Sequence, residues 1–184
     1  MVMRPPKPVK PLDMMPTQVR TAVFSQDLKY RYLLSRRWAY RDGNLIVWVM
    51  LNPSTANDTE NDPTIERCMR RSIEWGYAGM DVVNLYAFRA TSPANLFKAD
   101  DPVGPMNEDA LNAAFSRAEM ILLGWGAHAR HTEQERAVLR ELAGPLTADK
   151  VHFLKIGKGG APSHPLYLPY TLKPRRYFIG MAKR

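Results

Sequence analysis

The chain has 184 residues, of which 45% are hydrophobic and 24% are charged, a composition typical of one globular domain with a full core. Its one cysteine, Cys68, excludes an internal disulfide and any metal site built from several cysteines. No apolar run reaches the roughly 20 residues that a membrane-spanning helix needs, and the first residues lack the apolar core of a signal peptide, so we expect a cytoplasmic protein.

The formal net charge of +8 is unevenly distributed along the chain. Residues 1–41 contain nine Lys/Arg and two acidic residues, and residues 150–184 contain eight Lys/Arg and no acidic residue. The stretch between them contains nine Lys/Arg and sixteen acidic residues. If the two basic ends fold onto one face, they form a positive rim that suits a polyanion such as DNA. The alternative is an ordinary solvated basic surface with basic tails.

Five prolines within the first sixteen residues predict an extended arm, so we expect an arm over 1–16 and a single domain over 17–184. Strand-forming residues at 30–40 and 45–51 flank a turn signal at 41–44, which predicts an antiparallel hairpin that leads into the first central strand. Short apolar runs at 80–86, 120–125 and 151–156 predict three further strands, and two of these runs contain the adjacent valines or leucines that are typical of strands buried on both faces.

Helical patterns lie between these runs. Asp62 and Pro63 predict the start of a first helix, and apolar residues at helical spacing predict a second helix after Asn107. Thr132 and Glu135 fit a capping box at the start of a third helix. Strands that alternate with helices predict an α/β fold. We expect a three-layer α/β/α sandwich around a central, mainly parallel four-stranded sheet, plus an N-terminal antiparallel hairpin strand.

Each of the four predicted central strands is followed by polar, aromatic or glycine-rich sequence, in segments 52–58, 84–91, 124–128 and 157–168. Ligands of such sheets bind beyond the carboxyl ends of the strands, where these segments would meet. Four motifs lie there: MLNPS at 50–54, VVNL at 82–85, ILLGWGAHA at 121–129 and SHPLYL at 163–168.

The order and spacing of these motifs, over about residues 45–170, resemble the uracil-DNA glycosylase superfamily. In that superfamily a water-binding motif with Asp or Asn before Pro follows the first strand, and a His-Pro or His-Ser motif follows the last. The string LNPSTAND…DPTIERC…HPLYL is also similar to a family of uncharacterised bacterial and phage proteins. The resemblance implies a hydrolase that flips a pyrimidine out of DNA, cleaves its N-glycosidic bond and leaves an abasic site.

The resemblance implies that Asn52 positions the attacking water and that His164 donates a hydrogen bond to the departing base. Each has a simpler alternative, because Asn often caps a turn and an isolated His is more often a surface or core residue. Asn cannot act as a general base, so an acidic residue is expected beneath the sugar cation. We favour Asp58, because Asp62 suits the helix cap.

Base recognition is expected from four residues near the strand ends. Asn84 carries both a donor and an acceptor, so it can read a pyrimidine edge, although it could instead be a hydrogen-bonded polar residue at a strand end. Tyr86, Phe88 and Trp125 could stack on the base, although aromatic residues at such positions more often belong to the core.

DNA contacts are expected around the last motif. Leu166 or Tyr167 could fill the gap that a flipped base leaves, or could pack against the last strand. The basic residues of this region are natural phosphate contacts. They are Lys155, Lys158, Lys173, Arg175 and Arg176.

We therefore expect a monofunctional DNA glycosylase, because no lysine in the strand-end motifs is an obvious Schiff-base nucleophile. It would act as a monomer on DNA, without cofactor, metal or membrane contact. Uracil is the common target of the superfamily, and a modified cytosine or other modified pyrimidine in phage DNA would indicate an antiviral defence role. The alternatives are a non-catalytic DNA-binding module, favoured by Asn52 in place of Asp, and a hydrolase of free nucleosides or nucleotides, which the basic flanks disfavour.

Overall fold

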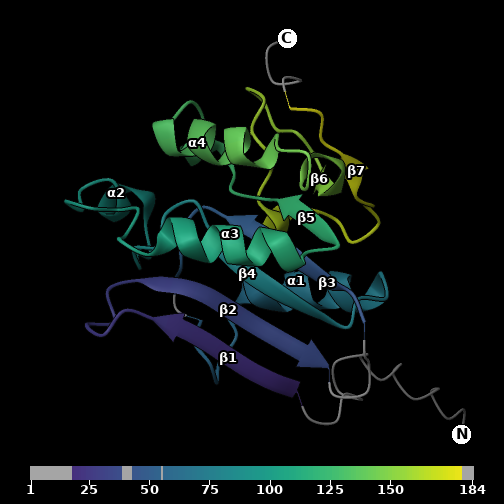
Figure 1. Ribbon diagram of the computed structural model, residues 1–184, viewed down its shortest axis with the longest axis horizontal. Coiled ribbons are helices and arrows are strands. Elements are labelled where there is room, and N and C mark those ends of the chain that lie inside the picture. Colours follow the sequence, from purple (N-terminus) through teal and green to yellow (C-terminus); the bar gives the residue numbers. More distant parts are fainter. Residues whose placement is uncertain (1–17, 39–42, 55, 180–184) are drawn as a thin grey trace, which may run out of the picture.

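A computed structural model describes residues 18–38, 43–54 and 56–179 (Figure 1). The predicted arm at 1–16 and the predicted turn residues Arg41 and Asp42 lie outside the described residues. The elements, in chain order, are β1 (Gln18–Phe24), β2 (Arg31–Trp38), β3 (Leu45–Met50), α1 (Pro63–Glu74), β4 (Gly79–Asn84), α2 (Pro93–Leu96), α3 (Asn107–Arg117), β5 (Met120–Leu123), η2 (Ala127–Ala129), α4 (Glu133–Leu142), η3 (Ala148–Lys150), β6 (Val151–Phe153), η4 (Pro165–Tyr167) and β7 (Arg175–Arg176).

The strands of the described residues form one sheet of seven, in the order β1-β2-β4-β3-β5-β6-β7. β3 runs parallel to both of its neighbours, β4 and β5, and β5 runs parallel to β6. The pairs β1–β2, β2–β4 and β6–β7 are antiparallel. The predicted α/β fold is confirmed, while the sheet is larger and contains more antiparallel pairing than the sequence predicts.

The predicted hairpin between 30–40 and 45–51 is wrong, because these two segments do not pair with each other. β2 is antiparallel, but its partners are β1 and β4, and both edges of β3 are occupied by β4 and β5. Residues 46–50 of β3 are all buried, which suits the centre of a sheet. The sequence does not predict β1, an edge strand on which Val19 and Val23 are exposed.

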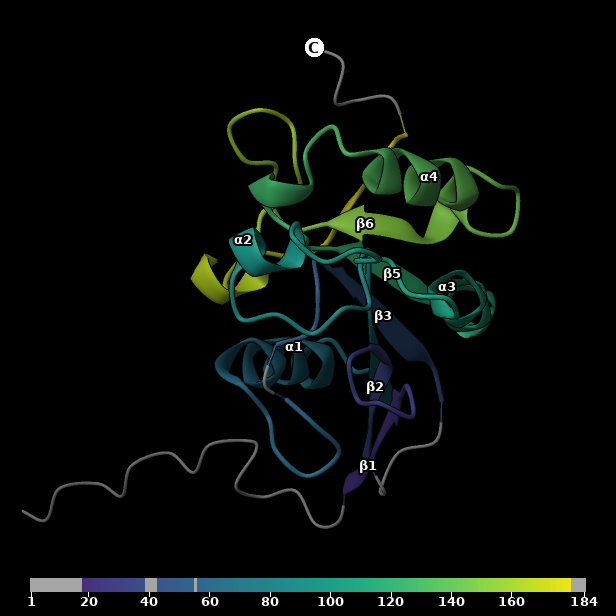
Figure 2. The same ribbon diagram turned by 90° about the vertical axis from the view of Figure 1, so that its left-hand side faces the viewer.

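Both faces of the sheet are covered by helices through two apolar clusters. On one face, α3 and α4 pack through Phe115 and Val138, and on the other α1 packs through Ile65 and Met69 against Trp48. Figure 2 shows the sheet nearly edge-on, with α1 on one side and α3 on the other. None of the helices in the described residues combines the length and apolar character that a membrane crossing needs.

Two of the predicted helix starts are governed by their caps. Asp62 accepts hydrogen bonds from the N–H groups of the next turn, and α1 begins directly after it. Thr132 likewise accepts from the N–H of Glu135, and α4 follows. The Glu135 carboxylate does not complete the capping box, because it accepts from Trp125 Nε1 at 3.0 Å and from the N–H of His131 at 2.7 Å. Glu135 therefore holds the segment that follows β5.

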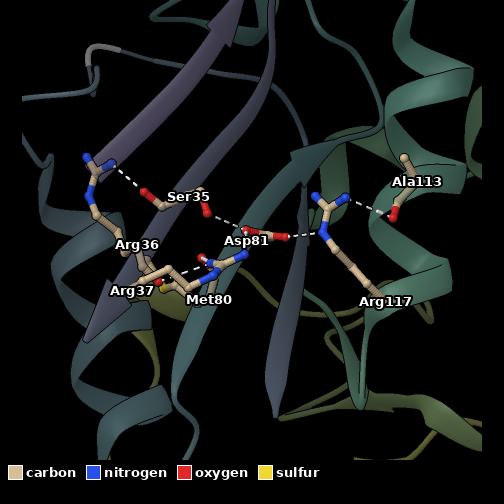
Figure 3. A network of polar contacts seen from close by, with 7 residues as sticks. All are labelled: Ser35, Arg36, Arg37, Met80, Asp81, Ala113 and Arg117. Atoms are coloured by element: carbon tan, nitrogen blue, oxygen red, sulfur yellow. Dashed lines mark hydrogen bonds and ion pairs between the residues drawn. The ribbon is translucent and has the colours of Figure 1, made fainter. Parts of the chain in front are cut away.

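A buried carboxylate joins two strands and a helix (Figure 3). Asp81 of β4 is fully buried and accepts from Ser35 Oγ at 2.7 Å. It also pairs with Arg37 Nη2 of β2 at 2.8 Å and with Arg117 Nε of α3 at 2.7 Å. Both arginines reach Asp81 from partly exposed positions, so the carboxylate is the buried member of the network.

Replacing Asp81 by asparagine is expected to lower the free energy of unfolding by about 3 kcal/mol, because two cations lose the buried charge that compensates them. Urea denaturation measures this loss. Glu133→Gln is the matched control, since Glu133 and both of its arginine partners are exposed, and its effect is expected to stay below about 1 kcal/mol. Equal losses in the two variants would contradict a special role for the buried network.

Candidate functional site

A cleft of about 1120 Å³ opens at the carboxyl ends of the parallel strands. Its lining includes residues at or shortly after the carboxyl ends of β3, β4, β5 and β6, together with residues of the 161–168 segment. In Figure 2 the arrowhead of β6 points to the side on which α2 lies. Seven of the residues singled out from the sequence line this cleft: Asn52, Asn84, Trp125, Lys155, Lys158, His164 and Tyr167.

Asn52 is held in one orientation by its amide nitrogen. Nδ2 donates to the carbonyl of Ala90 at 2.7 Å and to that of Pro53 at 3.0 Å. No described residue donates to Oδ1, which is the acceptor atom that remains. A half-buried amide held in this way can accept a hydrogen bond from a water molecule in the cleft.

Asn84, the last residue of β4, presents an uncompensated amide to the cleft. The residue is 1% exposed, and neither Oδ1 nor Nδ2 has a hydrogen-bond partner among the described residues. The backbone carbonyls beside this side chain do have partners, because Asn107 Nδ2 donates to the carbonyls of Asn84 and Leu85. A buried amide without partners costs about 1–3 kcal/mol, which a ligand with a matching donor and acceptor would recover.

His164 precedes η4 and has a defined tautomer. Its Nδ1 accepts from the N–H of Leu166 at 3.4 Å, so the ring proton of the neutral form is on Nε2. Burial lowers the pKa of His164, and the carboxylate of Asp62 opposes that effect. The turn after β5 passes close to it, because Gly126 has a φ of +78° and a Cβ there would lie 3.6 Å from His164 Cβ. The site thus holds a neutral imidazole that can donate from Nε2.

The backbone that follows His164 is held against α1 by hydrogen bonds from two arginines of that helix. Arg71, fully buried, donates from Nη2 to the carbonyls of Leu168 at 2.8 Å and Pro169 at 2.9 Å, and Arg67 donates to Leu168 at 2.6 Å. Both guanidinium groups lie over the ring of Tyr170, each 4.5 Å from its centre. These contacts fix η4, and with it His164, against the first helix.

The loop after β3 is held by arginines of the N-terminal strands. Arg31 donates to the carbonyl of Ala56 at 2.6 Å, and Arg36 donates to the carbonyl of Asn57 at 2.7 Å and to Asn61 Oδ1 at 2.9 Å. Burial lowers the pKa of each arginine to about 10, so both stay charged at neutral pH. Part of the basic charge that the sequence assigns to a DNA-facing rim therefore holds loop carbonyls inside the protein.

The predicted stacking aromatics mostly belong to the core. Trp125 lines the cleft, but it is 1% exposed and its indole N–H is used by Glu135. Tyr86 is buried, and Phe88 is half-buried against Tyr30. Tyr86 and Phe88 do not line the cleft.

The predicted DNA-contacting residues divide into two groups. Lys155, Lys158 and Tyr167 line the cleft, and Tyr167 is 82% exposed. The others lie outside its lining: Leu166 is half-buried, Lys173 pairs with Glu74, Arg175 lies over the ring of Phe153, and Arg176 pairs with Asp149.

The structure does not bring Asp58 to the cleft. Asp58 is exposed and does not contribute to the lining, whereas Asp62 does. Arg31 and Ser163 also line the cleft, and sequence reasoning assigns them no role. Ser163 is the first residue of the predicted SHPLYL motif and could have been proposed from it, but no sequence signal shows that Arg31, the first residue of β2, reaches this cleft.

Within residues 18–38, 43–54 and 56–179, no group of three His, Cys, Asp or Glu side chains could hold a metal ion. The model of the protein family described as "Protein of unknown function (DUF1643)" matches residues 31–166 of the chain. No curated protein and no solved structure matches the chain. The matched stretch includes Asn52, Asn84 and His164, and it contains every residue of the cleft lining except Tyr167 and Leu168.

Proposed function

The chain belongs to the family described as "Protein of unknown function (DUF1643)", and we propose that it is a monofunctional DNA glycosylase. It hydrolyses the N-glycosidic bond of a flipped-out uracil-like or modified pyrimidine and leaves an abasic site. The observation that carries the proposal is the buried amide of Asn84, which has no partner for either polar atom and lines the cleft together with Asn52 and His164. Pyrimidine edges present the donor and acceptor that such an amide lacks.

The chemistry follows from the three side chains. The bond between the anomeric carbon and the base nitrogen breaks, and its electron pair leaves with the base. Asn52 Oδ1 holds the water that forms the new carbon–oxygen bond, while neutral His164 donates from Nε2 to the departing base anion. The water loses one proton and the base gains one, so the reaction consumes one water molecule and releases a neutral base.

The resemblance to the uracil-DNA glycosylase superfamily supports this assignment. We further propose that β4, β3, β5 and β6, with α1 on one face and α3 and α4 on the other, form a three-layer core of that type. Each of the four motifs that carry the resemblance lies at the carboxyl end of one of these strands or in the segment after it, and each contributes residues to the cleft lining.

DNA would enter across the rim of the cleft. Lys155 and Lys158 are exposed there and can contact phosphates. Tyr167 is the better wedge of the two residues suggested by the sequence, because it is exposed at the rim whereas Leu166 is half-buried and outside the lining. Lys173 and Arg176 are already paired with acidic residues, so their part in DNA binding would be smaller.

The experiment is to incubate the purified protein with duplexes that each contain one candidate nucleoside: deoxyuridine, hydroxymethyldeoxyuridine, deoxycytidine or hydroxymethyldeoxycytidine. Alkali cleavage reports abasic sites, and mass spectrometry identifies the released base. We expect at least one duplex to yield both products. Release of a modified base from phage DNA would support an antiviral defence role. Salt-sensitive binding without any released base would favour a non-catalytic DNA-binding module, and cleavage of free nucleosides alone would favour a nucleoside hydrolase.

Replacing Asn84 by leucine is expected to abolish base release and yet stabilise the protein by about 1 kcal/mol. The apolar side chain has a similar volume and removes two buried polar atoms that have no partners. Thermal or urea unfolding measures the stability, and alkali cleavage measures the activity.

Asn107→Leu is the matched control for this substitution. Asn107 is also fully buried, but its Nδ2 makes two hydrogen bonds to backbone carbonyls, so the same change is expected to destabilise the fold. A clear loss of stability in Asn84→Leu would mean that its amide has a structural rather than a ligand-binding role.

A further inference from the structure

The cleft contains an acidic residue whose second oxygen is not used by the fold. Asp62 is the acidic residue among the described residues that line the cleft. Both of its capping hydrogen bonds, from the N–H groups of Thr64 and Ile65 at 2.9 Å each, fall on Oδ1. No described residue donates to Oδ2, and Asp62 takes part in none of the ion pairs formed by described residues. Capping α1 therefore uses only Oδ1 of this carboxylate and leaves Oδ2 without a donor among the described residues.

The charge of Asp62 acts on groups around the cleft. Burial lowers the pKa of Arg31 and of His164, and the negative charge of Asp62 partly offsets this lowering for both. Asp62 therefore interacts electrostatically with two residues of the cleft lining. The other cationic side chains of the lining are Lys155 and Lys158, which are exposed. A carboxylate in this position offers a negative charge to a cation that develops inside the cleft.

We infer that Asp62 is a catalytic residue that stabilises the positive charge of the sugar during base release, an inference that rests on the proposed glycosylase function. When the glycosidic bond breaks, the electron pair leaves with the base and the sugar ring becomes an oxocarbenium cation. Asn52 is an amide and supplies no negative charge to that cation. Asp62 supplies it through Oδ2 while Oδ1 continues to cap α1. The exposed Asp58 has no access to the cleft for this role.

The cap and the charge can be separated by one substitution. Asparagine is as good a helix cap as aspartate, so Asp62→Asn keeps the acceptor on α1 and removes the negative charge. The thermal midpoint of this variant should stay close to that of the wild type. We expect its rate of base release, measured at saturating enzyme on a duplex from which the wild type releases a base, to fall about 100-fold. Asp58→Asn, which changes the net charge equally, should keep the wild-type rate.

A binding experiment tests the inference without any base. Two duplexes are compared, one with a neutral tetrahydrofuran abasic site and one with a pyrrolidine abasic site that is protonated and mimics the sugar cation. The wild type and Asp58→Asn should bind the cationic duplex about tenfold more tightly, and Asp62→Asn should bind both duplexes with nearly the same Kd. The Kd for the neutral duplex should be similar in all three proteins.

The outcomes separate the inference from the proposed function. The inference is overturned if Asp62→Asn retains the preference for the cationic duplex, or if it releases base at the wild-type rate. It is equally overturned if Asp58→Asn loses the preference to the same extent, because net charge would then explain the effect. If no base of the duplex panel is released by the wild type, the glycosylase function fails, whatever the preference between the two abasic duplexes.

Discussion

Replacing His164 by alanine should slow base release by about 1000-fold while leaving the affinity for DNA within a few-fold of the wild type. The structure holds the imidazole beside the cleft with Nδ1 occupied by the N–H of Leu166, so Nε2 is the donor that the departing base would meet. Single-turnover assays at saturating enzyme measure the chemical step, and a gel shift measures binding. His152→Ala is the control, because His152 lies in β6 and does not line the cleft.

The pH dependence of the rate of base release shows whether His164 acts as a neutral hydrogen-bond donor or as a protonated acid. Burial lowers the pKa of His164 below the ordinary value of about 6.5, so the imidazole stays neutral in the folded protein at pH values where a free histidine is protonated. A neutral donor therefore predicts a rate that is maintained as the pH falls through 6.5. A rate that rises steadily over the same range would instead identify a protonated acid and contradict this role.

The same shift affects stability. As the pH falls through about 6.5, the unfolded chain takes up a proton at this residue before the folded protein does. His164 therefore contributes to stability above that pH, and the contribution is lost as the pH falls toward its lower folded-state pKa. The difference in unfolding free energy between the wild type and His164→Gln should shrink on acidification.

Asn52→Ala should also cost about 1000-fold in the rate of base release, because the attacking water loses the acceptor that positions it. Asn52→Asp is the more informative change. An aspartate in the same rotamer would place a carboxylate oxygen against the carbonyls of Pro53 and Ala90, which now accept from Nδ2. We expect Asn52→Asp to release base at least about 100-fold more slowly than the wild type. This result is expected even though some members of the uracil-DNA glycosylase superfamily, which the motifs resemble, have Asp at this point.

The assay for Asn52 is the same single-turnover measurement, with Asn95→Ala as the control on an exposed face of α2. Full activity in Asn52→Asp would show that the carbonyl contacts rearrange easily and that the amide is not required. Unchanged activity in Asn52→Ala would remove Asn52 from the mechanism.

The sequence predicts the parts of this structure that depend on local patterns. The starts of α1 and α4 follow from Asp62 and Thr132, whose short side chains cap a helix wherever they precede one. The segments that line the cleft also follow from the sequence. Asn52 follows one apolar run of strand length and Asn84 lies near the end of another, and parallel strands bring such ends to one edge.

The sequence does not predict the features that depend on contacts between distant segments. The order of the strands places β2 beside β4, although β2 and β3 are neighbours in the chain and suggest a hairpin. The roles of Arg31 and Glu135 are equally non-local, since each finds its partners in loops that only the folded chain brings near. The choice between Asp58 and Asp62 also needed the fold, because the two residues lie in the same loop and differ in which of them reaches the cleft.

Asp62 is the N-cap of α1. Arg71, in the third turn of the same helix, donates a hydrogen bond to the backbone that follows His164. One helix therefore fixes the separation between two parts of the cleft lining, Asp62 and the segment after His164, that are far apart in the chain. Because one extra residue rotates an α-helix by about 100° beyond the insertion, even a conservative insertion within this helix would turn Arg71 away from its carbonyls. Length variation in this protein should consequently be tolerated in the loops but not between these two residues.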